Sequence, residues 1–300
     1  MATLYTHKTE NISKTWALMF VFLCVVIAAG WAISTYYHNP GILFVSVILA
    51  IGMNIFSYWF SDTIVIAMAG AKPATGPAYL ELNQVVENLC ITAGLPKPKV
   101  YIIDDPAPNA FATGRNATHA SVAVTSGLLA MMSRQELEGV LAHELSHIGN
   151  RDMVVATIAV VLVGFVTLLS DFFWRSTLFG GGRDREEKQN PIVAVLSIVL
   201  VILAPIIATL LQLAISRRRE FLADASGALL TRYPEGLASA LRKIGSYTAP
   251  MRTANNATAH LYISNPFGGG AAKSFITKLF STHPPIDERI RALLGDKNLT

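Results

Sequence analysis

VLAHELSHIGNRD, residues 140–152, is the stretch that decides the fold, because it leads directly into an almost purely apolar segment that begins at Met153. Upstream, Ser133 and Glu136 have the spacing of a capping box, the pattern in which a Ser and a Glu cap a helix start reciprocally. Apolar residues then recur at helical spacing, at Leu137, Val140, Leu141, Leu145 and Ile148. The sequence therefore predicts a helix that ends or bends near 149–150, just as the apolar segment starts.

Two histidines on this helix suggest a metal site. His143 and His147 lie four residues apart, so both imidazoles lie on one face and can reach one ion. Glu144 is displaced in angle from both, so its carboxylate can reach water held by the metal and act as a general base. The alternative is two unrelated helical histidines, because H-E-x-x-H also arises by chance.

A catalytic zinc needs a third protein ligand and one open position. Another histidine is one option, and the chain offers His7, His38, His119, His260 and His283. A carboxylate is the other option, and Glu220 and Asp224 stand out because they lie four apart on a predicted helix. Glu220 is the candidate ligand, and Asp224 is the candidate for orienting an imidazole through its free N–H. A solvated acidic face after the basic residues 217–219 is the alternative interpretation.

Composition places the chain among membrane proteins. Of its 300 residues 52% are hydrophobic and only 15% are charged, with a mean hydropathy of +0.44, whereas a soluble domain of this size needs more charge on its surface. The net charge of +4 comes largely from short basic clusters beside apolar runs, and no aromatic-plus-basic motif argues for a nucleic-acid partner. We interpret Cys24 and Cys90 as small buried hydrophobes, since neither has disulfide or zinc-finger spacing.

Four apolar segments are long enough to cross a bilayer, which takes about 20 residues. They cover about 15–34, 41–60, 153–174 and 191–216. The first is too long for a signal peptide and lacks a small-residue cleavage site, so we expect it to be retained. Both termini and the segment after the second span are predicted to be cytoplasmic from the basic residues Lys8, Lys14, Lys72, Arg217, Arg218 and Arg219. The third and fourth segments could instead form a hairpin that packs partly against the protein.

The spans divide the chain into four parts, and the fold class that follows is a mainly α integral membrane protein with an α+β domain. Residues 1–70 form an N-terminal transmembrane hairpin, and 153–216 form a second one. The polar stretches 71–152 and 217–300 are each too short of apolar periodicity to form an enzyme alone. We therefore expect them to be the two halves of one cytoplasmic domain that carries the metal site.

A small β-sheet is predicted just before the helix that carries His143 and His147, hereafter the metal helix. Residues 99–104 have the pattern of a strand, and 109–114 with 119–125 are either a loop and a strand or a hairpin. A strand in this place could offer an open edge to an extended peptide. Asn109, Ala110 and Phe111 are therefore candidate substrate-binding residues.

A loop histidine near the C-terminal end is a further candidate for catalysis. His283 precedes two prolines that fix the local backbone, so it could donate to the oxyanion of a tetrahedral intermediate. A surface turn is the alternative. Arg289, in the helix predicted to follow, is a candidate ion-pair partner.

Four segments together carry a family resemblance: NAFATG at 109–114, HELSHIGNRD at 143–152, EFLAD at 220–224 and STHPP at 281–285. The chain resembles the HtpX family of bacterial membrane-integrated zinc metalloproteases, which is related to the CAAX prenyl proteases. The resemblance implies a gluzincin-like catalytic domain on the cytoplasmic side of the bacterial inner membrane. It implies one zinc ion held by His143, His147 and Glu220, with Glu144 as catalytic base and Asp224 supporting the site. It also implies action on misfolded or excess membrane proteins under stress, in cooperation with other quality-control proteases.

An endopeptidase is thus the favoured function, and two other classes are open. A zinc transporter or metal sensor would place polar or ionisable residues inside the membrane, whereas Asp171 is the only charged residue in the four segments. A structural membrane subunit braced by zinc would favour four protein ligands, commonly cysteines, and neither cysteine is near the motif.

Overall fold

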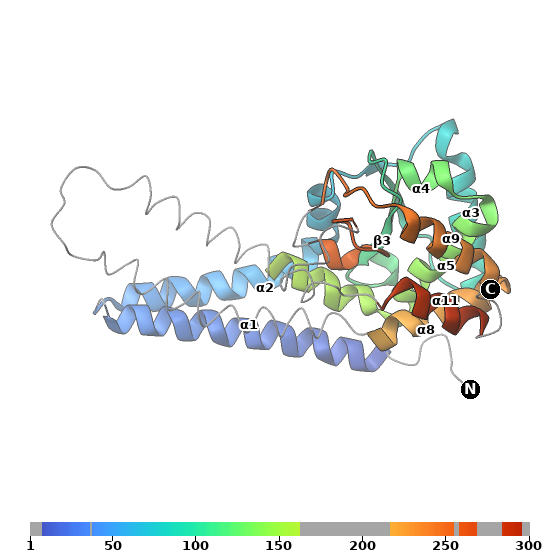
Figure 1. Cartoon of the computed structure of the whole chain (residues 1–300). Helices are drawn as coiled ribbons and strands as arrows, with labels where there is room; N and C mark the ends of the chain where they lie inside the picture. Colours follow the sequence, from blue (N-terminus) through green and yellow to red (C-terminus); the bar gives the residue numbers. More distant parts are fainter. Residues whose placement is uncertain (1–7, 37, 163–216, 255–257, 269–283, 296–300) are drawn as a thin grey trace.

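The computed structural model describes residues 8–36, 38–162, 217–254, 258–268 and 284–295. Its principal helices are α1 Lys8–Tyr36, α2 Pro40–Met68, α3 Leu80–Ala93, α4 Ser126–Met131, α5 Arg134–Asn150, α8 Arg217–Thr231, α9 Pro234–Ser246 and α11 Ile286–Leu294. The strands are β1 Lys72–Pro73, β2 Lys99–Ile103, β3 Ala110–Gly114 and β4 Ala120–Thr125. Short 3-10 turns are present at Pro77–Tyr79, Ala117–His119 and Ala259–Leu261. Figure 1 shows the long pair α1 and α2 projecting from a globular part that contains the sheet and the other labelled helices.

The projecting pair agrees with the first two predicted spans. Within the described ranges, Asn11–Ala32 and Pro40–Met68 are long and apolar enough to cross a membrane. α2 begins cleanly because Asn39 accepts a hydrogen bond from Gly41 N and a proline occupies the first turn. Large apolar side chains on this pair point outward, among them Trp16, Phe20, Trp31 and Phe44. Cys24 is also exposed on α1, so its predicted burial is wrong, because it lies on the outward face of the pair.

The metal helix ends where the sequence predicts a bend. α5 stops at Asn150, and Arg151 adopts a left-handed conformation with φ 59°. The next helix, Asp152–Leu162, leaves at an angle of 84° to α5. It is the start of the third predicted span; the rest of that span, residues 163–174, and the whole fourth span, 191–216, lie outside the described residues.

The sheet is small and mixed, with strand order β1-β2-β4-β3. β2 confirms the strand expected at 99–104, and it runs parallel to β4. β3 pairs with β4 in antiparallel fashion, from Ala110 opposite Val124 to Gly114 opposite Ala120, so the hairpin interpretation of 109–125 is the correct one. β3 is an edge strand of this sheet, on the side nearest α5.

One hydrophobic core joins segments from before and after residues 153–216. α5 packs against α8 and α9, and α11 packs against α9 and α8. Fully buried apolar side chains from α3, β4, α5 and α9 meet there, including Val86, Val122, Val140, Leu141, Leu237 and Leu241. Full burial of one such side chain contributes about 2 kcal/mol to stability. These contacts therefore hold the metal helix against α8 and α9. The proposed boundaries of the four parts stay predictions, but the described residues of the two polar stretches share one hydrophobic core.

Candidate metal centre

α5 carries two candidate ligands and directs both to one point. The predicted capping box is present: Ser133 Oγ accepts a hydrogen bond from Glu136 N, and the Glu136 carboxylate accepts one from Ser133 N at 2.7 Å. His143 and His147 lie one turn apart on the resulting helix, with their Nε2 atoms 3.2 Å from each other. His143 is almost fully buried, with 1% of its side chain exposed, whereas His147 keeps 15% of its side chain exposed.

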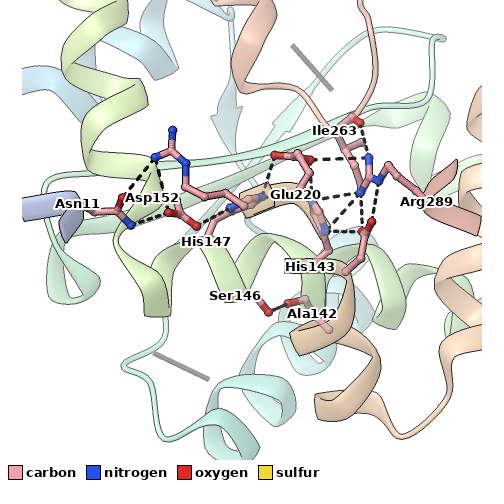
Figure 2. Close-up of polar contacts among 11 residues, drawn as sticks. Asn11, Ala142, His143, Ser146, His147, Asp152, Glu220, Ile263 and Arg289 are labelled. Carbon is pink, nitrogen blue, oxygen red and sulfur yellow. Dashed lines mark hydrogen bonds and ion pairs between the residues drawn. The ribbon is translucent and has the colours of Figure 1, made fainter. Parts of the chain in front are cut away.

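α8 brings the third candidate ligand. It packs tightly on α5 at Gly227, where a Cβ would lie 2.9 Å from the backbone nitrogen of His143. Glu220, two turns earlier on α8, reaches both rings (Figure 2): Oε2 lies 3.7 Å from His143 Nε2, and Oε1 lies 3.6 Å from His147 Nε2. His143, His147 and Glu220 thus offer ligand atoms that all lie within 4.8 Å of one another.

These three donor atoms fit a small divalent cation. Zinc bonds of about 2.0–2.1 Å to nitrogen and oxygen give a tetrahedron whose edge is roughly 3.3 Å. The separation of the two Nε2 atoms is 3.2 Å, and the two oxygens of Glu220 lie 3.6 and 3.7 Å from one ring each, which is close to that edge. Within the described residues the group consists of three side chains. Three protein ligands with a fourth position left for water are typical of catalytic rather than structural zinc sites.

The two imidazoles differ in their electrostatics. Burial lowers the pKa of His143 to about 4, so this ring is neutral at pH 7 and offers a lone pair. Burial also opposes protonation of His147, but its hydrogen bond to Asp152 and the nearby Glu220 carboxylate raise the pKa of His147 to about 9. In the metal-free chain the proton of His147 therefore faces His143, at a place that a metal ion would take on binding.

Asp224 and Arg289 support the His143 ring from behind. Asp224 Oδ1 lies 2.9 Å from His143 Nδ1, which is the contact that an orienting carboxylate requires. Arg289, on α11, donates two hydrogen bonds to the same carboxylate, from Nε at 2.8 Å and from Nη2 at 2.7 Å. It also donates to Ile263 O at 3.1 Å. Both side chains are buried, and although burial alone would raise the pKa of Asp224, the Arg289 charge holds it below its usual value. The ion-pair role expected for Arg289 thus has a partner, Asp224.

Asp152 supports the other ring, and sequence reasoning missed it. Its Oδ2 lies 3.2 Å from His147 Nδ1, so each candidate ligand has a carboxylate on its second ring nitrogen. The signal was present, since Asp152 is the first acidic residue after the H-E-x-x-H motif. It could not be interpreted without the left-handed Arg151, which turns Asp152 back toward His147.

Glu144 lies beside the candidate ligands, since it interacts electrostatically with His147 and Glu220. It is 2% exposed, and burial raises its pKa to about 7, although the His147 ring and a backbone hydrogen bond from Ala112 of β3 act to lower it. A carboxyl group with a pKa near neutrality can accept and release a proton at pH 7.

The predicted substrate-binding residues lie at the start of β3 (Ala110 and Phe111) and directly before it (Asn109), and all three are buried. Asn109 is 2% exposed, and its side-chain amide donates a hydrogen bond to Ser264 O at 3.0 Å. The Phe111 ring packs edge-on against Tyr262 with centroids 5.1 Å apart. Ala110 O accepts a hydrogen bond from Ile263 N at 2.9 Å. Contact with a substrate through these side chains stays a prediction.

The other histidines considered as ligands lie elsewhere or outside the described residues. His38 follows α1, His119 bonds to its neighbour Asn116, and His260 contacts Ala156 O at 3.3 Å. His7 and His283 fall outside the described ranges, so the predicted oxyanion role of His283 stays a prediction.

Comparison with known proteins gives a consistent result. Residues 79–297 match peptidase family M48. The chain is 45% identical over 304 residues to a protein described as "Protease HtpX homolog" from Caldanaerobacter subterraneus subsp. tengcongensis, covering 99% of this chain and 98% of the relative. It is 46% identical to a protein of the same description from Thermoanaerobacter pseudethanolicus, with the same coverage. A third such protein, from Desulfatibacillum aliphaticivorans, is 51% identical over 252 residues, or 83% of this chain and 79% of the relative.

A solved structure resembles the fold. The crystal structure of S. mikatae Ste24p superposes with a TM-score of 0.50 at 18% identity and covers 95% of this chain. The chain spans 66% of the length of Ste24p. At this identity the likeness concerns the arrangement of the elements alone.

Proposed function

Because the chain belongs to peptidase family M48 and is a membrane-associated metalloprotease, we propose that it is a zinc-dependent endopeptidase with a gluzincin-like site that cleaves misfolded or excess membrane proteins. The observation that carries the proposal is the convergence of His143, His147 and Glu220 within 4.8 Å beside the buried Glu144. Each of these residues has the chemistry that peptide hydrolysis needs at that place.

We propose that His143, His147 and Glu220 hold one zinc ion, since their separations suit tetrahedral coordination. When bound, zinc supplies polarisation of the scissile carbonyl and lowers the pKa of water. Asp224 and Asp152 hold the Nδ1 protons of the two rings. This fixes both Nε2 lone pairs toward the ion.

Glu144 is the proposed general base. It takes a proton from the attacking water and passes it to the amine that leaves when the C–N bond breaks. Its raised pKa suits both steps at pH 7, because the carboxylate must first accept and then release the proton. The hydrogen bond from Ala112 keeps the carboxylate against β3.

The outer edge of β3 is the proposed binding place for the substrate backbone. Asn109 O accepts from Thr125 N of β4, so alternate residues Ala110, Ala112 and Gly114 direct their peptide groups away from β4. Ala110 O is taken by Ile263 N, and Gly114 N faces Thr157 Oγ1 at 3.4 Å. Ala112 lies between them, and because its N–H donates to Glu144, its carbonyl oxygen is the group to which an extended peptide could bind. Asn109 and Phe111 would then act by holding the strand in place.

We propose that the catalytic part faces the cytoplasm from a bacterial inner membrane crossed four times. The basic residues beside the spans support this orientation. Two of the four spans correspond to α1 and α2. Cooperation with other quality-control proteases stays a prediction.

The test is Glu144→Gln in the full chain, reconstituted with zinc and given an unfolded membrane polypeptide. The variant should keep its zinc, because Glu144 is not a proposed ligand, and should lose at least about 10²-fold in cleavage rate. Glu138→Gln is the matched control, since this residue lies on the same helix and pairs with Arg134 near the surface. Undiminished cleavage by the Glu144→Gln variant, with contaminating proteases excluded, would refute the proposed base.

A further inference from the structure

A buried polar cluster joins the start of the first membrane helix to the end of the metal helix. It consists of Asn11 on α1, Asn150 and Asp152 at the bend after α5, and Arg219 on α8. Figure 2 shows Asn11 and Asp152 side by side next to His147. Asn11 is 1% exposed and Asp152 is 6% exposed. A buried polar cluster at a helix contact is costly unless its members pair, so the pairing within it is informative.

Asn11 makes the central contacts of this cluster. Its Nδ2 donates to Asp152 Oδ1 at 2.6 Å and to Asn150 O at 3.0 Å. Its Oδ1 accepts from Arg219 Nη1 at 3.4 Å, and the same Nη1 lies 3.7 Å from Asp152 Oδ1. The amide therefore uses both of its ends, one toward the bend and one toward α8.

The two oxygens of Asp152 have separate partners. Oδ2 accepts from His147 Nδ1 at 3.2 Å, whereas Oδ1 accepts from Asn11. A carboxylate held at one oxygen alone can rotate about its last side-chain torsion, which is broad. Asn11 restricts that rotation, and the restricted carboxylate restricts the His147 ring.

We propose that Asn11 is a positioning residue for the metal site, acting on His147 through Asp152. The inference rests on the proposed function, because it takes His147 as a metal ligand. It extends the support of the site to a residue of the first candidate span, 141 positions before Asp152 in the chain. The position of α1 relative to α5 is thus part of what holds His147 Nε2 toward the ion.

The experiment measures zinc affinity of the full chain in lipid nanodiscs, by competition with a chelator of known affinity. Asp152→Asn should weaken zinc binding by about 10- to 100-fold, as loss of a ligand's supporting carboxylate does. Asn11→Leu keeps the side-chain size and removes the amide, so it should weaken zinc binding in the same direction but less. Thr15→Val is the matched control: Thr15 is buried one turn further along α1 and bonds to Asn11 O within the helix, and its zinc affinity should equal that of the parent.

A double variant separates positioning from a general effect on folding. If Asn11 acts through Asp152, Asn11→Leu should have no further effect on zinc affinity in the Asp152→Asn background, since coupled residues are not additive. The same fractional loss in both backgrounds would overturn the relay. If Asn11→Leu does not fold, Asn11→Asp serves instead, because it keeps size and polarity but places an acceptor against Asp152.

Failure of the relay can be told apart from failure of the proposed function. A parent chain that binds no zinc would overturn both. A parent that binds zinc, together with an Asn11→Leu variant of equal affinity, would overturn the relay alone. Zinc loss on Asn11→Leu that Thr15→Val does not share, and that disappears in the Asp152→Asn background, is the result we expect.

Discussion

Replacing Arg289 by methionine should destabilise the catalytic part severely, even in the absence of metal. Arg289 is 0% exposed and Asp224 is 1% exposed, and they share two short hydrogen bonds of 2.7 and 2.8 Å. Arg289→Met would leave the Asp224 carboxylate buried without its cation. Breaking a buried ion pair from one side costs about 3–5 kcal/mol, against a total stability of about 5–15 kcal/mol for a typical domain.

Cys90 provides the assay. This thiol is 2% exposed on α3, which packs against α5, and burial raises its pKa to about 11, so it reacts with thiol reagents only when the catalytic part opens. Labelling of Cys90 against urea concentration, in zinc-free protein with the exposed Cys24 replaced by serine, gives the free energy of unfolding. The tryptophans of α1 and α2 would report on the membrane pair instead.

Two further variants test whether the buried pair of Arg289 and Asp224 causes the loss of stability. Arg291→Met, on the exposed side of the same helix, should change the free energy of unfolding by no more than about 0.5 kcal/mol. Adding Asp224→Asn to Arg289→Met removes the unpaired charge, so it should recover part of the loss by a coupling of about 1–3 kcal/mol. If the Arg289→Met and Arg291→Met variants unfold at the same urea concentration as the parent, the buried pair contributes nothing and our account of it is wrong.

Two other predictions concern the packing and the start of the metal helix. Gly227→Ala would push α8 away from α5, because the new Cβ meets the His143 backbone at 2.9 Å; we expect a loss of about 1–3 kcal/mol and weaker zinc binding as Glu220 moves with α8. Gly52→Ala, where a Cβ meets nothing within 4 Å, is its control, and equal zinc affinity in both variants would contradict the prediction. Burial alone would raise the pKa of Glu136, but hydrogen bonds from Lys243, Ser239 and Ser133 lower it to about 2. Since the folded pKa lies below the unfolded value, the stabilisation is present above pH about 4.5 and is lost as the pH falls through about 2. Glu136→Gln should therefore cost about 1–3 kcal/mol at pH 7, allowing for the half-exposed Lys243, and less at pH 3; a cost that does not change between these two pH values in urea unfolding would count against it.

Features set by local spacing could be predicted from the sequence. The capping box at Ser133, the two histidines one turn apart and the bend near 149–150 follow from helix geometry within a few residues, and the structure has all three. The approach of Glu220 to both histidines was predicted from its chemistry rather than from its position. Its physical cause, the close contact at Gly227, has no pattern of its own in the sequence.

Features that depend on long-range contacts could not be predicted. The carboxylate on His147 comes from Asp152 because a non-glycine residue, Arg151, adopts φ 59°, which L-residues rarely do. Asn11 meets Asp152 because α1 packs beside the bend. Part of the β3 edge that we expected to be open is occupied, since Ile263 N donates to Ala110 O. The residue pattern of a strand predicts the strand itself but not which of its backbone groups are already bonded.

The pairing of Asp224 with Arg289 has a consequence for the time at which a newly made chain acquires activity. Arg289 follows Asp224 by 65 residues, which takes roughly 3–13 s to synthesise at about 5–20 residues per second. Until α11 has been made, Asp224 has no guanidinium beside it and the His143 ring has no fixed support. During that interval the nascent chain lacks the ion pair that fixes Asp224 against the His143 ring, so this side of the site reaches its final geometry only after α11 has been made.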